Sequence, residues 1–341
     1  MATKTGTDSG SVFSETGGSR TIHRSKGSVF RVAVTRFGTV GAFVVMIVYF
    51  EIASSGLMLR TQNIGSILNQ SAPLGLLSIG LTLCLILGLF DLSIGYTGTL
   101  AGMVCTGLML NQGVAWPLAL VATLVMGALI GLINGFIVTV LRVNALVATL
   151  AMGSVISGIL LWYSIAPFSG IFPQAFLDFG QSSIFPWLPV SVLVFAGVAL
   201  FMWTFLEKTP TGRRMYAVGG NEEAARIAGV RIKLMQVVAF VVCGLCASGS
   251  GIVLAAQLGS GQPTGEIGLL LSAFAAAFLG SATWREGEFH IMGTVIGVLI
   301  LNVVFSGLAL TNAPYWLKYV ITGMVLILAV AMGSSLRSKN P

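Results

Sequence analysis

Charged side chains are scarce in this sequence. Asp, Glu, Lys and Arg together make up 9% of its 341 residues, whereas a soluble domain carries roughly 25%. Hydrophobic residues reach 55%, and the mean hydropathy is +0.94. Several uncharged runs reach the roughly 18 residues that are needed to cross a bilayer. These features exclude a water-soluble globular fold and predict a chain embedded in lipid.

Residue types that carry catalysis or bind metals are also few. There are two His, His23 and His290, and no G-x-x-x-x-G-K-[ST] sequence for binding ATP through a P-loop. The four Cys all lie in apolar segments: Cys84, Cys105, Cys243 and Cys246. The last two form a C-x-x-C spacing, but a metal or redox site needs further ligands and electropositive neighbours. We therefore expect packing cysteines, no catalytic site, no metal and no cofactor bound by this chain.

Apolar segments fill most of the remaining chain and predict its fold class. We expect an all-α polytopic membrane protein with about ten transmembrane helices in a domain spanning 37–333. The ten predicted segments are 37–57, 64–88, 95–112, 116–141, 146–165, 186–206, 234–257, 265–283, 291–311 and 314–333. Residues 334–341 are expected to form a short cytoplasmic tail.

The basic residues predict how the segments are oriented. If the N-terminus is inside, 16 of the 18 Lys and Arg lie on the inner side, and only Arg60 and Lys318 lie outside. Such a bias indicates cytoplasmic N- and C-termini and an even number of spans. The net charge of +7 is then explained by topology, so nucleic acid is not needed as a partner.

The first 36 residues have a different composition from the rest. They are rich in Ser, Thr and Gly and carry six of the basic residues. A secretory signal peptide has its apolar core much nearer the start, so we do not expect one here. A disordered cytoplasmic tail is the best interpretation.

The longest polar interruption, 209–233, predicts one short helix. Asn221 is a good N-cap residue, and two acidic residues follow it in the first turn, where they complement the helix dipole. Glu222 and Arg226 are spaced for an ion pair. Gly229 suits the left-handed conformation that ends a helix. We expect a helix of about seven residues over 222–228.

A helix this short is marginally stable on its own, because isolated helices need about 12–15 residues in water. Its small apolar residues suit docking in a shallow groove of a cytoplasmic partner: Ala224, Ala225, Ile227, Ala228 and Val230. The alternative is a solvated surface helix that closes a loop. If docking holds, Ala225→Glu should abolish association with the partner.

Asp91 is the most informative residue within the apolar segments. A carboxylate at membrane depth is costly and normally faces a cavity or a partner. Four glycines surround it, so we expect a broken or closely packed helix, and hydroxyl groups lie nearby on Ser93 and Tyr96. Asp91 either contacts a polar solute or caps the helix that begins near Ile94. Asn134 is also within an apolar segment, and interhelical hydrogen bonding is its simplest role.

Glycine spacing predicts where helices pack closely. The chain has 43 Gly. Gly127, Gly131 and Gly135 fall on one helix face, and Gly293 and Gly297 fall on another. Such faces let helix backbones approach each other in a packed bundle.

Three blocks of the sequence resemble the membrane-spanning permease subunits of bacterial ABC importers for simple sugars, the ribose/xylose/arabinose/galactose group. The blocks are FDLSIG at 90–95, GLINGFIVTVLRVNALVATLAMGSVISG at 131–158 and TPTGRRMYAVGGNEEAARIAGV at 209–230. The resemblance runs from about Leu74 to about Ala331. The third block is the most specific, because a polar segment has no compositional reason to repeat this pattern.

The resemblance implies an importer that moves a monosaccharide (pentose, hexose or related polyol) across the inner membrane by alternating access. It implies two halves of inverted topology and three protein partners: a cytoplasmic ATPase that holds ATP and Mg²⁺, a periplasmic or lipid-anchored binding protein, and a second, identical or different, permease chain. The coupling helix that contacts the ATPase would comprise Gly220, Asn221, Glu222, Glu223, Ala224, Ala225, Arg226, Ile227 and Gly229. Candidates for the translocation path are Asp91, Ser93, Tyr96 and Asn134.

The sequence departs from the family at the start of the eighth segment. Family members often have an acidic pair there, whereas this chain has Leu270 and Ser272, with Glu266 as the nearest acid, and Ser281 replaces a second Gly. These departures leave the identity of the sugar open. Two other functions also stay open: an ion-coupled secondary transporter, which would need more intramembrane acids, and a membrane-embedded enzyme, which would need a catalytic constellation.

Overall fold

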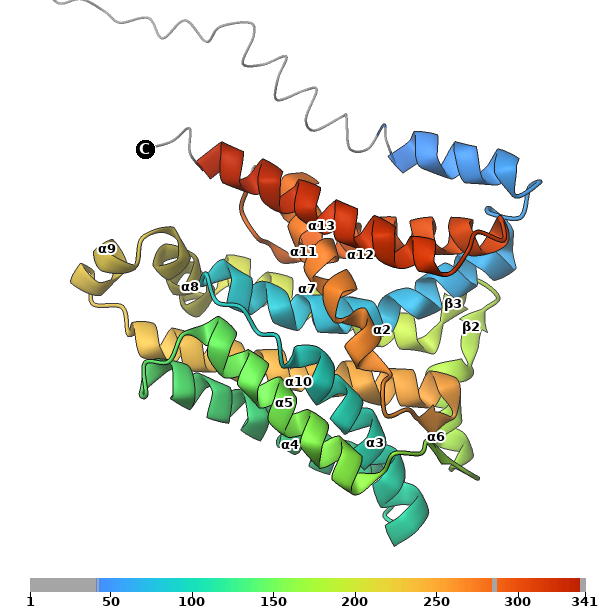
Figure 1. Ribbon diagram of the computed structural model, residues 1–341, viewed down its shortest axis with the longest axis horizontal. Helices are drawn as coiled ribbons and strands as arrows, with labels where there is room; N and C mark the ends of the chain where they lie inside the picture. Colours follow the sequence, from blue (N-terminus) through green and yellow to red (C-terminus); the bar gives the residue numbers. More distant parts are fainter. Residues whose placement is uncertain (1–40, 42, 284–286, 338–341) are drawn as a thin grey trace, which may run out of the picture.

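The computed structural model describes residues 41, 43–283 and 287–337 (Figure 1). The predicted tail over 1–36 and the loop residue Arg285 lie outside the described residues. Within them the protein is a bundle of long helices joined by short loops, so the predicted all-α polytopic class is confirmed.

Each predicted apolar segment corresponds to a helix. The helices are a first one over Phe43–Ala53, α2 (Thr61–Ile86), α3 (Ile94–Gln112), α4 (Trp116–Thr139), α5 (Ala145–Tyr163), α7 (Val190–Lys208), α10 (Ile232–Leu258), α11 (Leu270–Thr283), α12 (Ile291–Leu310) and α13 (Trp316–Arg337). The 3-10 turn η1 (Glu266–Leu269) leads into α11. Among the described residues, seven helices are long and apolar enough to cross a membrane: α2, α4, α5, α7, α10, η1 with α11, and α12. The count of ten spans and the inverted halves stay predictions.

Shorter elements gather at the two ends of the bundle (Figure 1). One end holds α8 (Pro210–Gly220) and α9 (Glu222–Ile227). The other holds α6 (Gln174–Gln181) and four strands: β1 (Phe168–Ser169), β2 (Ser183–Phe185), β3 (Leu188–Pro189) and β4 (Ser260–Gly261). The strands form two antiparallel pairs, β1 with β4 and β2 with β3. The β1–β4 pair therefore ties the loop after α5 to the loop after α10.

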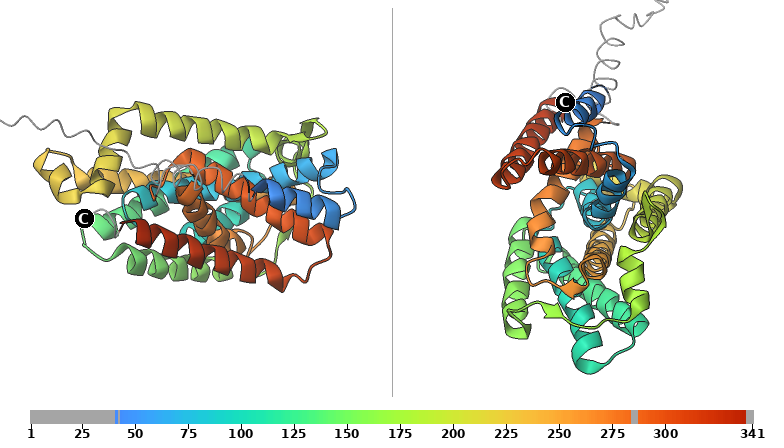
Figure 2. Two further views of the ribbon diagram at one scale, coloured as in Figure 1. Left: turned by 90° about the horizontal axis from the view of Figure 1, so that it is seen from above. Right: turned by 90° about the vertical axis from the view of Figure 1, so that its right-hand side faces the viewer.

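The core of the bundle is built around α10, which packs against α2, α3 and α4 (Figure 2). A Cβ at Gly131 of α4 would collide with the Phe240 carbonyl of α10, and one at Gly127 would collide with Ser248. Backbones therefore meet where glycine removes the side chain. The same holds between α11 and α12, where a Cβ at Gly297 would meet the Ala276 carbonyl. Both predicted glycine faces are confirmed as packing faces.

The helices differ from the sequence prediction most clearly around the stretch 209–233 and at the C-terminal end. Most of the polar stretch 209–233 is helical, because α8 precedes α9 and α10 already begins at Ile232. The start of α8 is stabilised by Thr209, whose Oγ1 accepts from the Gly212 N–H at 3.1 Å, and by a proline at the first helical position. At the C-terminal end, α13 continues to Arg337 instead of stopping at 333.

Candidate functional site

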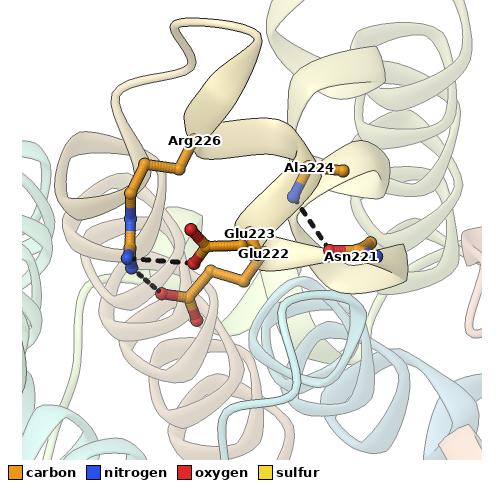
Figure 3. A network of polar contacts seen from close by, with 5 residues as sticks. All are labelled: Asn221, Glu222, Glu223, Ala224 and Arg226. Atoms are coloured by element: carbon orange, nitrogen blue, oxygen red, sulfur yellow. Dashed lines mark hydrogen bonds and ion pairs between the residues drawn. The ribbon is translucent and has the colours of Figure 1, made fainter.

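The helix α9 confirms the local prediction at its start. Asn221 has an extended backbone, and its Oδ1 accepts a hydrogen bond from the Ala224 N–H at 2.9 Å (Figure 3). The helix then runs over Glu222–Ile227, six residues rather than the expected seven. The N-cap hydrogen bond satisfies one of the free N–H groups of the first turn.

The polar side of α9 is a three-residue ion-pair cluster. Arg226 contacts Glu222 at 2.9 Å and Glu223 at 3.1 Å (Figure 3). All three side chains are more than half exposed, so the pairs contribute at most about 1 kcal/mol each. The cluster therefore shapes the surface of α9 more than it stabilises the protein.

The end of α9 is closed by glycine, as predicted. Gly229 has a φ of +78°, a left-handed conformation that L side chains rarely adopt. The Val230 N–H returns to the Ala225 carbonyl at 3.0 Å. This hydrogen bond satisfies a carbonyl of the last turn, which the helix leaves free.

The apolar residues of α9 divide between two faces, which differs from the prediction. Ala225 is 4% exposed and packs against the main core of the bundle, whereas Ile227 is 82% exposed. Ala224 and Gly220 are exposed as well. Of the small apolar residues expected to dock on a partner, Ala225 therefore packs inside its own chain, whereas the large side chain of Ile227 is exposed.

The neighbouring helix α8 connects α9 to the bundle. Its Met215 and Val218 are buried in the main core. A Cβ at Gly219 would collide with the carbonyl of Ile86, the last residue of α2. The backbone of α8 therefore directly contacts the end of a membrane helix.

Helical structure is interrupted between α2 and α3, as the sequence predicts, and this interruption is called the break. Asp91 lies in this break and is 2% exposed. Its Oδ1 accepts from the Ser93 N–H at 2.9 Å and from the Ser93 hydroxyl at 2.6 Å. The Asn134 amide of α4 donates to the same hydroxyl at 2.8 Å. The carboxylate thus holds the turn that precedes α3, but the N-cap residue of α3 is Ser93, and the printed bonds of Asp91 reach only Ser93 and no N–H group within the helix.

The other translocation candidate, Tyr96, is not part of the hydrogen bonds that join Asp91, Ser93 and Asn134. Its ring packs against Gly153 of α5 in a cluster with aliphatic side chains. The sequence analysis missed Thr149, whose Oγ1 accepts from the Leu92 N–H at 3.0 Å. Thr149 is a helix-interior hydroxyl in an apolar segment, and only the fold shows that it faces the break.

Two thiols approach the carboxylate of Asp91. Cys84 of α2 and Cys243 of α10 place their sulfurs within 4.8 Å of each other and of an Asp91 oxygen, and all three residues are buried. Three potential ligands are fewer than the four of a structural zinc site. The Asp91 oxygen Oδ1 also already accepts two hydrogen bonds from Ser93. The arrangement has the donor types of a metal site but is explained by close packing of α2 and α10.

A second polar region, in the half of the bundle away from α8 and α9, was not predicted as a site. Glu266 is 1% exposed, and neither of its carboxylate oxygens has a hydrogen-bond partner among the described residues. It lines a small hollow, with about 10 Å³ open to a water-sized sphere, between α3, α10 and the segment after α10. The sequence did contain a signal for this region. Glu266 is the acid nearest to the positions where family members often have an acidic pair and this chain does not.

Comparison with known proteins identifies relatives over most of the chain. The family described as "Branched-chain amino acid transport system / permease component" matches residues 63–330. This range agrees closely with the 74–331 over which the resemblance was recognised.

Individual relatives share about a third of their residues with this chain. The ribose import permease protein of Bacillus subtilis is 34% identical over 294 residues, 86% of this chain and 90% of the relative. The ribose import permease protein of Escherichia coli is 33% identical over 277 residues, 79% and 84% respectively. The D-allose transport system permease protein of Escherichia coli is 30% identical over 297 residues, 87% and 91%. No solved structure matches the chain.

Proposed function

The chain belongs to the family of permease components of ABC sugar import systems, and from this membership we propose that it is the permease subunit of an ATP-driven importer for a simple sugar. The solute would be a monosaccharide, a pentose, hexose or related polyol. The family description refers to branched-chain amino acids. The similar proteins named for ribose, allose and L-arabinose, at 30–34% identity over most of the chain, support a sugar instead.

The chain would work with three partners and hold no cofactor itself. A cytoplasmic ATPase would bind ATP and Mg²⁺, a periplasmic or lipid-anchored protein would deliver the sugar, and a second permease chain would complete the pathway. The complex would lie in the bacterial inner membrane with the α8–α9 end and both termini in the cytoplasm. The charge bias of 16 basic residues against two supports this orientation.

The observation that carries the proposal is the geometry of α9. It presents an exposed Ile227 beside the ion-pair cluster of Glu222, Glu223 and Arg226, while α8 links it to the end of α2. An apolar side chain with a polar rim suits a protein interface. ATP-driven closure of the ATPase pair would move α9, and α8 would pass this movement to α2. The bundle would then shift between outward-open and inward-open states, a two-state equilibrium biased by the ATPase.

The test is uptake by the complete transporter in liposomes. ATP enclosed with the ATPase subunits should drive uptake of radiolabelled D-ribose, L-arabinose or D-allose when sodium and proton gradients are abolished. Uptake that persists without ATP and follows an imposed ion gradient would establish the rival secondary transporter. Two buried acids in the described part of the chain bear on that rival: Asp91 is engaged in the turn before α3, whereas Glu266, at the start of the η1–α11 span, is the acid on which ion coupling would depend.

A further inference from the structure

Glu266 is the one carboxylate in the described bundle that is fully buried and has neither oxygen hydrogen-bonded. Ser250 lies beside it, but the Ser250 hydroxyl donates to the Pro73 carbonyl at 2.7 Å. A buried acceptor without a donor is energetically costly, so such groups normally await a partner. Within a membrane protein, an unpaired ionisable residue that lines a cavity is a candidate binding residue.

The position of this carboxylate is fixed by its own backbone. The Thr99 hydroxyl of α3 accepts from the N–H groups of Glu266 and Ile267 at 3.0 and 3.1 Å. The same hydroxyl donates to the Gly95 carbonyl, so it has no capacity left for the Glu266 carboxylate. The turn η1 is therefore tied to α3, and its first side chain lines the hollow with both oxygens free.

The hollow is polar on the side of the loop that follows α10. Ser260 and Gln262 line it, and the Gln262 amide donates to the Ser260 hydroxyl at 2.9 Å. The space open to a water-sized sphere is about 10 Å³, which is room for about one water. In this conformation the hollow is too small for a sugar, so binding of a sugar there requires it to widen.

Glycines form the closest contact between two walls of the hollow, α3 and α10. Gly98 and Gly102 of α3 face Gly251 of α10, and a Cβ at Gly251 would collide with the Gly98 carbonyl. Relative movement of α3 and α10, which alternating access requires, would widen the space at Glu266.

We propose that Glu266 is a solute-contacting residue of the permeation path, whose carboxylate accepts hydrogen bonds from two hydroxyl groups of a passing sugar. Hydroxyl groups on adjacent carbons of the sugar would present two donors to the two oxygens of the Glu266 side chain. Gln262 would supply a further amide contact. This inference rests on the proposed sugar-import function and locates its solute site in the half of the bundle opposite α9.

The first test compares two acid-to-amide variants in the complete transporter. Glu266→Gln replaces one acceptor oxygen by a donor and should lower uptake at subsaturating sugar at least about tenfold. Glu51→Gln is the matched control, because the Glu51 carboxylate lies outside the hollow and already accepts from the Leu59 N–H at 2.9 Å. It should leave uptake unchanged. Both variants should copurify with the ATPase, and unchanged uptake by assembled Glu266→Gln would overturn the inference.

A second test needs no variant and so does not depend on folding of Glu266→Gln. A hydrophobic carbodiimide reacts with buried membrane carboxyl groups, and mass spectrometry of peptides measures its reaction at Glu266. D-ribose, L-arabinose or D-allose should slow labelling at Glu266 in the wild-type complex, without slowing labelling at Asp91. Protection by sodium chloride and by none of the sugars would make the hollow an ion site and overturn the proposal.

The two tests also separate this inference from the proposed function. If the wild type shows no ATP-driven uptake of any of the three sugars, sugar import is refuted, yet protection of Glu266 by a sugar would still support the contact. If the wild type transports a sugar that does not protect Glu266 from labelling, and Glu266→Gln transports it equally well, the proposed import function is supported and the inference about Glu266 is contradicted.

Discussion

At the scale of single residues, burial decides what each side chain of α9 can do. Ala225 and Ile227 are two positions apart, yet one is 4% and the other 82% exposed. The composition of the helix does not distinguish them, because both are apolar. Only the contact of α9 with the bundle shows that Ala225 supports the fold and that Ile227 is available to a partner.

Glutamate substitutions at these two positions should therefore fail in different ways. Ile227→Glu changes an exposed side chain and should alter the free energy of unfolding by no more than about 0.5 kcal/mol, while copurification with the ATPase is lost. Ala225→Glu buries a charge and should destabilise the protein by roughly 3–5 kcal/mol. Thermal unfolding in detergent and pull-down of the ATPase measure the two effects. Normal ATPase binding by Ile227→Glu would remove α9 from the interface.

Asp91 leads to a second prediction at this scale. Asp91→Ala removes the acceptor for both the N–H and the hydroxyl of Ser93, which should cost about 1–3 kcal/mol for each donor left buried. Asp91→Asn keeps an acceptor oxygen and should be milder. Glu51→Ala should be milder too, because the Glu51 side chain is only partly buried. Thermal stability and uptake should fall together in Asp91→Ala. Full stability with lost uptake would instead indicate direct solute contact.

At the scale of helices, local chemistry was predictable and helix partners were not. The Asn221 cap, the Glu222–Arg226 ion pair and the Gly229 terminus depend on residues a few positions apart, and all three are confirmed. The long helices follow from the lipid's demand for uninterrupted apolar segments. The helix α8 was missed although Thr209 and Pro210 mark its start, because the stretch was interpreted as loop. The hollow at Glu266 joins residues from α3 and the loop after α10, more than 150 positions apart, so hydropathy could not reveal it.

The close contact between α4 and α10 at glycine positions leads to a prediction at this scale, in which one Gly→Ala variant is compared with a control. Gly131→Ala places a methyl group against the Phe240 carbonyl and should destabilise the bundle by about 1–3 kcal/mol. Gly158→Ala on α5 is the control, since a Cβ there meets nothing within 4 Å. Thermal unfolding of the two purified variants should separate them clearly. Equal stability would mean that α4 and α10 are less closely packed than the structure shows.

At the scale of the whole molecule, the question is how movement at α9 reaches the solute path. α8 touches the end of α2 through Gly219, and α2 and α3 both pack against α10. The break that holds Asp91 joins α2 to α3, and α3 forms a wall of the Glu266 hollow. Contacts therefore run without a gap from α9 through α8 and α2, across the break, to α3. They connect the two ends of the bundle. Contact alone does not prove coupling, which requires a functional test.

Two glycines supply that test. A Cβ at Gly219 of α8 would collide with the Ile86 carbonyl, whereas one at Gly197 of α7 meets nothing within 4 Å. Gly219→Ala should push α8 away from α2 and lower sugar uptake per ATP hydrolysed, while ATPase binding through Ile227 persists. Gly197→Ala is the control and should keep wild-type coupling, since the added methyl group meets nothing within 4 Å. Simultaneous measurement of uptake and ATP hydrolysis in liposomes distinguishes these outcomes. Wild-type coupling in Gly219→Ala would show that movement enters the bundle through α7 or α10, which α8 also contacts, and not through the end of α2.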